Sequence, residues 1–481
     1  MKALSNLLRI FPNRIFAQRR RGAEKTGFGP LRLCASARDR FGKLQLSIVL
    51  TTLSTIALFA SPSVAAAPVQ LSAGAASADI TPDTRMRNTF YPQPWGSVRD
   101  PIFARAFVLS DGTTRVAFIG WDLVDAREYA VARVREAVSM ATGIPGDHII
   151  VHATHTHSGP KSEMGSEPLA AFERKAALPA QQDPLYKPWA DKLVATCVTL
   201  VRDADRNRQP VTLSIGRAYV GEVLFNRRPE KPDGTVQTMM LPPDPYVLAK
   251  GLRFGKLDPT LTVLAMRNGT GDNVATLVHL AAHAVSIYGG FKGISADWPG
   301  AVVNRFKEGV GGEPFVLQGC AGDIVPWRRG PEAVEHMSKL IWERGSAALK
   351  VAEKLDAARL RTSRAILGLP ASPQEQAASG RITLPAEVQV VTCGSLALVT
   401  LPGEPLNELG VAIQDRSPFP HTLVLGYANG RGATYVGLPG KKWKGGYEMS
   451  HVGTGGDEVG QSMVDSAVRL LKEHAALAQG R

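Results

Sequence analysis

The sequence predicts a mixed α/β fold, in which several β-sheets with flanking helices form one large domain. Hydrophobic residues make up 44% of the 481 positions, which is enough for a substantial core. From Asp100 onward, short apolar stretches alternate with amphipathic ones, and no long repeat or low-complexity tract interrupts them. We therefore expect one folded domain over residues 68–481, preceded by a separate segment over residues 1–67.

The first half of this domain contains both kinds of element. Apolar runs predict buried strands, and amphipathic spacing predicts helices. The region Asn207 to Asp258 is rich in proline, glycine and charge, so we expect it to be dominated by loops. The expected elements are strands over Arg115–Leu123 and Asp147–His157, helices over Glu128–Thr142 and Tyr186–Asp203, and a strand over Val274–His279.

The second half repeats the alternation. Apolar residues at helical spacing between Glu332 and Leu355 predict a long amphipathic helix. A Gly-rich stretch from Gly426 to Gly456 precedes the last helix. The other expected elements are a helix after Pro299, strands over Pro314–Gln318, Val388–Val391 and Leu396–Leu401, and a final helix over Val459–Leu471.

Residues 1–67 have the features of an export signal. The cluster Arg19-Arg20-Arg21 forms a basic flank, an apolar stretch runs from Leu46 to Ala60, and small residues suited to cleavage follow up to Ala67. We expect a periplasmic or secreted protein after cleavage, or an amino-terminally membrane-anchored one if cleavage fails. Residues 1–65 hold 11 of the 56 basic and 2 of the 43 acidic residues, which leaves a net charge of only +4 for the rest. Nucleic-acid binding therefore loses its main support.

Three cysteines follow the leader, at Cys197, Cys320 and Cys393. Each lies in an apolar run, as a small buried hydrophobe would. Three sparse cysteines can form at most one bridge, so the sequence predicts no disulfide framework.

The segment Thr154-His155-Thr156-His157-Ser158-Gly159-Pro160 is the most informative motif. In an extended strand, residues two apart project to the same face, so His155 and His157 are expected to converge. An isolated His-x-His pair is weak evidence for a metal site. Its place where a strand runs into a loop strengthens the hypothesis, because sites are usually built at such junctions.

Other polar residues also follow predicted strands. His283 precedes Ala284-Val285-Ser286, and Glu404 follows Pro402-Gly403. Two neutral imidazoles and one carboxylate are a common ligand set for catalytic zinc. His279 and His283 lack the glutamate of a zincin helix, so that class of metallohydrolase is not indicated.

These residues together resemble the neutral/alkaline (non-lysosomal) ceramidases, which are zinc amidohydrolases that cut the N-acyl bond of ceramide. The resemblance runs from Gly74-Ala75-Ala76-Ser77-Ala78-Asp79-Ile80-Thr81-Pro82 through the His155 motif and Ser295-Ala296-Asp297-Trp298-Pro299-Gly300 to Leu401-Pro402-Gly403-Glu404. It covers nearly all of the chain after the leader and implies a single metallohydrolase-type catalytic domain.

The resemblance also implies roles for individual residues. It places a Zn²⁺ ion on four ligands and assigns contacts with the substrate amide to three further residues. One of these three is Arg227, for which the adjacent Arg228 is the alternative. Without the resemblance, the two tyrosines among these residues would be interpreted as packing of a Gly-rich loop. The implied metal ligands are His155, His283, Glu404 and Tyr435, and the implied catalytic residues are His157, Tyr447 and Arg227.

One departure from the family bears on the substrate. Where the ceramidases carry a serine, this chain has Val325 in Gly322-Asp323-Ile324-Val325-Pro326, so no serine nucleophile is available there. The chain also ends soon after its last predicted helix, which we interpret as a bacterial short form without the carboxy-terminal β-domain. The expected function is zinc-dependent hydrolysis of N-acylsphingosine or a related N-acyl lipid. A zinc hydrolase of another amide or ester, or a degenerate binding protein with a metal pocket, are the alternatives.

Two further hypotheses concern residues near the motifs. Asp297 is expected either to orient a ligand imidazole or to cap the helix that follows. Lys441, Lys442 and Lys444 flank Trp443, which predicts either transient contact with anionic lipid headgroups or a solvated loop.

Overall fold

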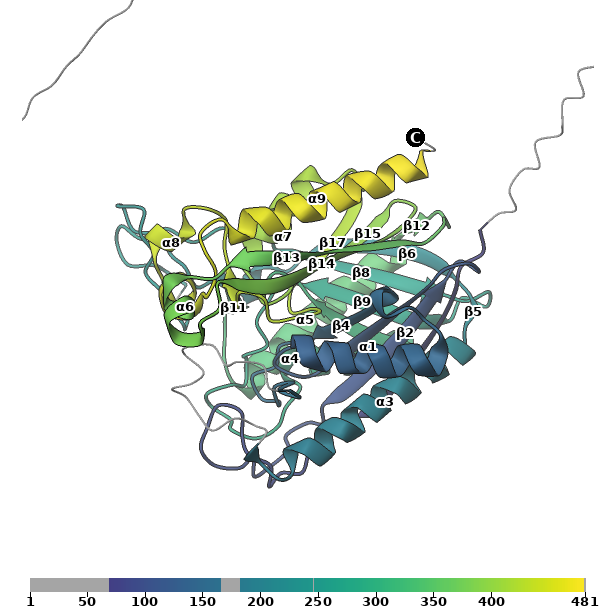
Figure 1. The fold of residues 1–481 in the computed structure, drawn as a ribbon, viewed down its shortest axis with the longest axis horizontal. Helices are drawn as coiled ribbons and strands as arrows, with labels where there is room; N and C mark the ends of the chain where they lie inside the picture. The colour runs from purple at the N-terminus through teal and green to yellow at the C-terminus, as the bar shows by residue number, and fades with distance from the viewer. Residues whose placement is uncertain (1–68, 166–181, 245, 480–481) are drawn as a thin grey trace, which may run out of the picture. The chain divides into compact units, whose positions relative to one another are not determined.

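The computed structural model describes residues 69–165, 182–244 and 246–479. The predicted export segment and its apolar stretch lie outside these residues, so cleavage and localisation stay predictions. Within the described ranges, no helix is both long and apolar enough to cross a membrane. Residues 66–481 form one compact unit, and the expected mixed α/β class is confirmed (Figure 1).

The first sheet has the strand order β4-β3-β2-β1-β5. Helices α1 (Glu128–Thr142) and α3 (Tyr186–Arg206) cover one of its faces. Gly74 allows this packing, because a Cβ there would lie only 2.1 Å from the carbonyl oxygen of Ala204 in α3. Its strands are β1 (Ser72–Asp79), β2 (Phe103–Ser110), β3 (Arg115–Trp121), β4 (Ile149–Ala153) and β5 (Gln209–Pro210).

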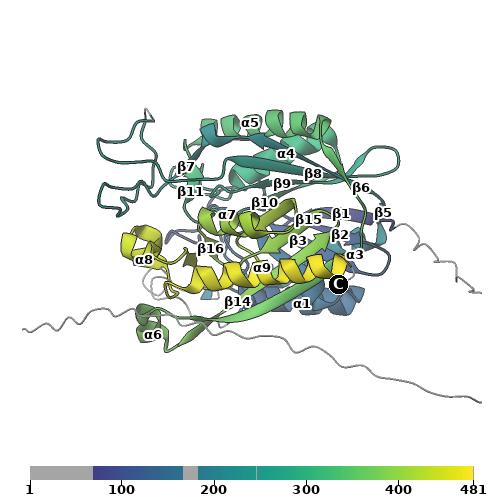
Figure 2. The same cartoon turned by 90° about the horizontal axis from the view of Figure 1, so that it is seen from above.

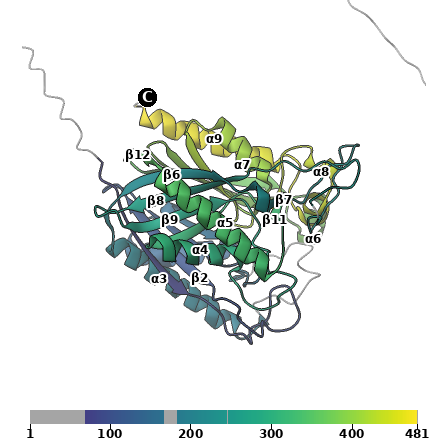
Figure 3. The ribbon, with the colours of Figure 1, turned by 180° about the vertical axis from the view of Figure 1, so that it is seen from behind.

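The second sheet, of order β10-β9-β8-β6-β12, packs against the other face of the first. The rings of Phe107 and Phe315 meet edge to face between the two sheets, with centroids 5.3 Å apart. Helices α4 (Asp297–Val310) and α5 (Pro331–Lys350) cover its outer face, as Figure 3 shows. Its strands are β6 (Thr212–Tyr219), β8 (Thr260–Arg267), β9 (Asn273–Leu280), β10 (Glu313–Gln318) and β12 (Glu353–Leu355).

A third sheet, of order β13-β14-β15-β17, closes one side of this sandwich (Figure 2). In strand β14, successive side chains point to opposite faces of the sheet, and both faces are covered. Val388 and Val390 pack with α7 and α9, whereas Val391 faces the core shared with the other sheets. The elements are β13 (Arg361–Pro370), α6 (Pro373–Ser379), β14 (Thr383–Cys393), β15 (Leu396–Thr400), α7 (Asn407–Arg416), β17 (His421–Leu425) and α9 (Val459–Ala478).

Two small two-stranded sheets and several short helices carry most of the remaining candidate residues. Strand β7 (Leu224–Asn226) pairs antiparallel with β11 (Ile324–Pro326), and β16 (Glu404–Pro405) pairs parallel with β18 (Tyr435–Val436). The short helices are η1 (Gly146–His148), η3 (Gly221–Val223), α8 (Lys441–Lys444) and the π-helical turn η4 (Glu448–Val452).

The structure corrects several expected elements. The strand expected over Asp147–His157 ends at Ala153, and the helix expected up to Leu355 ends at Lys350, followed by β12. The region expected to be loops over Asn207–Asp258 contains β6, whose apolar residues Leu213 and Ile215 alternate with small and polar ones, a short pattern that the composition argument overlooked. Cys197, Cys320 and Cys393 are free and buried, in agreement with their apolar surroundings.

Two buried charges join the first and third sheets. Arg135 of α1 makes bonds of 2.8 and 2.6 Å to the two carboxylate oxygens of Glu387 in β14. Arg364 bonds the same carboxylate from a more exposed position.

We expect Arg135→Met to lower the free energy of unfolding by about 3 kcal/mol, because it leaves the buried carboxylate of Glu387 with too few donors. Arg364→Met is the matched control, with an expected loss of under about 1 kcal/mol. Urea unfolding measures both, and equal losses would contradict the special role of Arg135.

The same carboxylate gives stability a pH dependence. Burial acts to raise the pKa of Glu387, but bonds from Arg135 and Arg364 outweigh it and hold the pKa below its usual 4.5. A lowered pKa contributes stability above the unfolded value, and this contribution is lost as the pH falls. The stability difference between wild type and Glu387→Gln should therefore shrink below pH 4.5. A difference that stays constant in unfolding measurements across this range would argue against the linkage.

Candidate functional site

The two histidines of the His-x-His motif lie on a loop, not on the strand that was expected. Strand β4 ends at Ala153, and His155 takes a left-handed backbone conformation with φ of 65°. For a residue other than glycine this backbone conformation costs free energy. Such strained residues are frequent at functional sites. The turn still brings the two imidazoles together, with 3.1 Å between the Nε2 atoms of His155 and His157. Their convergence is confirmed, although the strand argument for it is wrong.

His283 reaches the same point from the loop after β9. Its Nδ1 donates to the carbonyl oxygen of Ala321 at 2.5 Å, and the indole of Trp298 donates to the His283 carbonyl at 3.1 Å. The carboxylate of Asp297 accepts from the backbone N–H groups of Ser286 and Ile287 instead of from an imidazole. The hypothesis that Asp297 orients a ligand imidazole is therefore wrong in this structure; the residue holds the loop that follows His283.

Glu404 and Tyr435 are direct partners in the parallel pair β16–β18. Gly403 precedes the glutamate with a φ of 71°, and a Cβ there would lie 2.4 Å from the carbonyl oxygen of Arg431. Only glycine fits such a turn without strain. The Pro-Gly-Glu motif thus has a local explanation, because its glycine lets the chain turn so that Glu404 pairs beside Tyr435.

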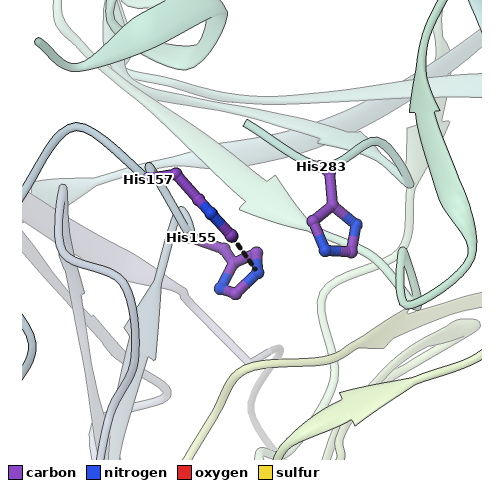
Figure 4. A group of neighbouring side chains, drawn as sticks. All are labelled: His155, His157 and His283. Carbon is purple, nitrogen blue, oxygen red and sulfur yellow. Dashed lines mark hydrogen bonds between the residues drawn. The ribbon is translucent and has the colours of Figure 1, made fainter. Parts of the chain in front are cut away.

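The donor atoms of these segments converge on one point, and Figure 4 shows the three imidazoles around it. The ligand nitrogens of His155, His157 and His283 all lie within 4.8 Å of one another. Oxygen Oε2 of Glu404 lies 3.1 Å from Nε2 of His155 and 3.2 Å from Nε2 of His283. The hydroxyl of Tyr435 is 3.5 Å from the same His283 nitrogen.

This donor set fits a metal cation. The Nδ1 atoms of His155 and His283 both face backbone carbonyls, at 2.6 Å from Val124 and 2.5 Å from Ala321. Each Nδ1 must then carry a proton, so in the neutral imidazole each Nε2 presents a lone pair toward the carboxylate of Glu404. Lone pairs that converge with a carboxylate repel one another unless a cation lies between them. Ligand histidines commonly make this kind of bond through their other nitrogen.

Burial also sets the protonation of these groups. It lowers the pKa of His283 to about 4 and that of His157 well below its usual range. Burial acts to raise the pKa of Glu404, but interactions with His155 and His283 outweigh it and hold the pKa well below its usual range. Burial raises the pKa of Tyr435 well above its ordinary value. His157 and His283 are therefore neutral imidazoles, Glu404 is an ionised carboxylate and Tyr435 is a neutral phenol.

Arg227 and Tyr447 lie next to this cluster. The guanidinium carbon of Arg227 is 5.5 Å from the ring centroid of Tyr435 and 5.6 Å from that of Tyr447. Its Nη2 donates to the Tyr435 hydroxyl at 3.0 Å. Arg228, the alternative candidate, instead reaches the carbonyl oxygen of Gly445. The structure thus brings Arg227 to the cluster, and the roles assigned to the site residues stay predictions.

A cavity of about 100 Å³ opens beside the converging donor atoms. This volume is below the roughly 300–1,000 Å³ of typical small-molecule sites. Phe90 lines this cavity and stacks on the His157 ring at 4.9 Å, and Tyr288 meets the same ring edge-on at 5.0 Å. The cavity lining includes His155, His157, Glu404, Tyr427, Tyr435 and Tyr447.

Val325 does not line this cavity. It is fully buried on β11, opposite Phe225 of β7, in a small apolar cluster with Val285. Tyr288 packs against this cluster and also contacts His157. The Val325 cluster is therefore connected to His157 through Tyr288.

The sequence argument missed several contributors to the site. Tyr427 stacks on His155 with ring centroids 4.2 Å apart, and it too has a positive φ, of 54°. The carbonyls of Val124 and Ala321 have no sequence signature, because any residue supplies one. Phe90 lies in an irregular segment outside the quoted motifs. For Tyr427, its position in the Gly-rich stretch was the only available signal.

The basic residues around Trp443 are partly neutralised. Trp443 lies on α8 with 64% of its surface exposed. Lys444 pairs with Glu230 at 2.9 Å, and Lys441 pairs with Glu408 at 2.8 Å. These pairs weaken the hypothesis of contact with anionic lipid headgroups, which stays untested.

Known proteins provide an independent comparison. A family model described as neutral/alkaline non-lysosomal ceramidase, N-terminal, matches residues 73–333. Neutral ceramidase B from Dictyostelium discoideum is 24% identical over 241 residues, which is 47% of this chain but only 31% of that relative.

Solved structures agree in fold. The crystal structure of neutral ceramidase from Pseudomonas aeruginosa has a TM-score of 0.67 at 18% identity, over 84% of this chain and 75% of that one. A structure described as ceramidase complexed with C2 has a TM-score of 0.66 at 17% identity, over 84% and 76% of the two chains. The family model spans more than half of the 481 residues, and the motifs that contain His155 and Glu404 meet at one site. The chain therefore belongs to the neutral/alkaline non-lysosomal ceramidase family.

Proposed function

We propose that this chain is a zinc-dependent hydrolase that cleaves the amide bond of an N-acyl lipid such as N-acylsphingosine. One observation carries the proposal. The Nε2 atoms of His155 and His283 both face Oε2 of Glu404, at 3.1 and 3.2 Å, while their Nδ1 atoms face backbone carbonyls. Two imidazoles and one carboxylate with an open position are a typical set for catalytic zinc.

Four residues would hold the metal in this proposal. His155, His283 and Glu404 would supply three donors, and Tyr435, whose hydroxyl is 3.5 Å from Nε2 of His283, would be the fourth. Zinc bound there would supply a Lewis acid that polarises an amide carbonyl and lowers the pKa of water. Binding to tyrosinate oxygen would also offset the effect of burial on the Tyr435 phenol.

His157 has a different environment from the two proposed ligand histidines. Its Nδ1 is buried without a hydrogen-bond partner among the described residues. Phe90 and Tyr288 hold its ring from two sides. An imidazole without a fixed second bond can exchange protons, so we assign His157 as the base that takes a proton from the attacking water and then delivers it to the leaving amine.

Tyr447 and Arg227 complete the proposed machinery. The hydroxyl of Tyr447 belongs to a ring that lines the cavity beside Glu404. It can donate a hydrogen bond to the carbonyl oxygen as negative charge develops there. Arg227 would add positive charge behind both tyrosine rings.

A second candidate substrate is an amide or ester with a small acyl group. The cavity of about 100 Å³ favours it, because a long acyl chain would extend beyond the enclosed volume. Val325 also removes the serine that the family carries at its position. A degenerate binding protein is less well supported, since the complete donor set is retained.

Metal content tests the proposed ligands. We expect wild-type protein to bind one equivalent of zinc and to lose its hydrolytic activity after chelation. His155→Ala should lower zinc affinity and turnover of a fluorescent N-acylsphingosine by at least about 10²-fold. His148→Ala is the matched control, because that imidazole bonds the carbonyl of Arg115 at 3.0 Å and lies outside the site. Metal analysis and turnover assays would refute the ligand set if His155→Ala kept full zinc affinity.

A series of acyl chains separates the two substrate candidates. N-acylsphingosines with short and long chains are compared by kcat/KM, beside simple N-acyl amides. If the acyl chain binds on the protein, each buried methylene contributes about 0.8 kcal/mol, so long chains should be favoured by at least about tenfold. A preference for the shortest chains, or turnover only of simple amides, would move the assignment to the second candidate.

A further inference from the structure

Glu448 is a fully buried acid at the start of η4 that no motif explained. Its two carboxylate oxygens each accept a hydrogen bond of 2.6 Å from one of two successive arginines, Arg227 and Arg228. A buried carboxylate needs such partners, because an unpaired charge away from water is strongly destabilising. Glu448 therefore fixes both guanidinium groups.

The two arginines bonded to Glu448 differ in what else they reach. Arg227 donates to the Tyr435 hydroxyl at 3.0 Å and to the carbonyl oxygen of Gly322 at 2.8 Å. Arg228 donates to the carbonyl oxygen of Gly445 at 2.8 Å. Only Arg227 thus connects the carboxylate to the donor cluster, which makes Arg228 a natural internal control.

The backbone around Glu448 is shaped for this contact. Gly445 and Gly446 have φ values of 70° and 91°, and a Cβ on Gly446 would lie 2.6 Å from Nη1 of Arg228. The backbone N–H of Tyr447 donates to the hydroxyl of Thr238 at 2.8 Å. The segment that carries Tyr447 and Glu448 is thereby held against the segment that follows Arg228.

We propose that Glu448 is a positioning residue, which acts through Arg227 to hold the Tyr435 hydroxyl beside His283. Arginine side chains lose rotamer entropy when they are ordered. A carboxylate that orders Arg227 before substrate binds removes this cost from the reaction. Displacement of a positioned group by about 1 Å can reduce catalysis by roughly 10²-fold.

This inference rests on the proposed function for its link to catalysis, but its first readout is independent of substrate. Zinc dissociation constants are measured for wild type, Glu448→Gln, Arg227→Met and Arg228→Met. Loss of a group that orients a metal ligand typically weakens metal binding by about 10–100-fold. We expect that loss for Glu448→Gln and Arg227→Met, and a change of less than about threefold for Arg228→Met.

Kinetics provide the second readout. For an N-acyl substrate that the wild type hydrolyses, Glu448→Gln should lower kcat by about 10²-fold with a much smaller change in KM. In a Tyr435→Phe background the same substitution should add little to the loss, because the group that it positions is already absent. Glu448→Asp keeps the charge on a shorter side chain, and it replaces Glu448→Gln in every comparison if that variant is not recovered folded.

The outcomes separate the inference from the proposed function. If Arg228→Met weakens zinc binding as much as Arg227→Met and Glu448→Gln do, the cluster only supports the fold and the inference is overturned. Additive losses in the Tyr435→Phe background would overturn it too. If the expected zinc pattern appears but no N-acyl lipid is hydrolysed, the proposed substrate fails and the positioning role of Glu448 stands.

Discussion

The site depends on two hydrogen bonds that the sequence cannot reveal, because their acceptors are backbone carbonyls. The Nδ1 atoms of His155 and His283 each donate to a backbone carbonyl, of Val124 and Ala321. These bonds fix the tautomer and the orientation of both rings. Because the Nε2 lone pairs then face Glu404, a cation is the natural partner of the whole arrangement. The left-handed backbone at His155 is the strain that this geometry requires.

The three-sheet architecture explains why these carbonyls can be placed so accurately. Val124 follows strand β3, and Ala321 lies in the short connection between β10 and β11. Strands β3 and β10 are buried between layers of the fold. His155 follows β4 of the first sheet, His283 follows β9 of the second, and Glu404 follows β15 of the third. The site thus lies where loops from all three sheets meet, and packing of the sheets fixes the separation of the ligands. Sites supported by rigid elements in this way are more precise than sites on a single mobile loop.

The sequence predicted the fold class and several elements because buried strands and amphipathic helices carry periodic signals. Helix Glu128–Thr142 agrees in both bounds with α1. Strand β6 was missed because it lies in a region rich in proline, glycine and charge, and the extent of the strand before His155 was overestimated because the apolar run gives no sign of a left-handed turn. The candidate ligands were found through motifs, which local sequence can show. Phe90, Tyr427 and Glu448 could not be found in this way, since their importance comes from contacts with residues distant in the chain.

The balance of charge at the site follows from the same contacts. Glu404 and Glu448 bring two negative charges into the interior, and Arg227 and Arg228 bring two positive charges. The four groups together are close to neutral, so a divalent cation held by the donor cluster would leave an excess of positive charge. A buried site of this kind favours groups on which negative charge develops, such as the carbonyl oxygen of an amide under attack. This electrostatic preference concerns only the atom on which negative charge develops. It does not depend on the rest of the substrate. Under the proposed function, the electrostatics of the cluster would specify the class of reaction, whereas the small cavity and the Phe90 ring beside His157 would specify which acyl group can reach it.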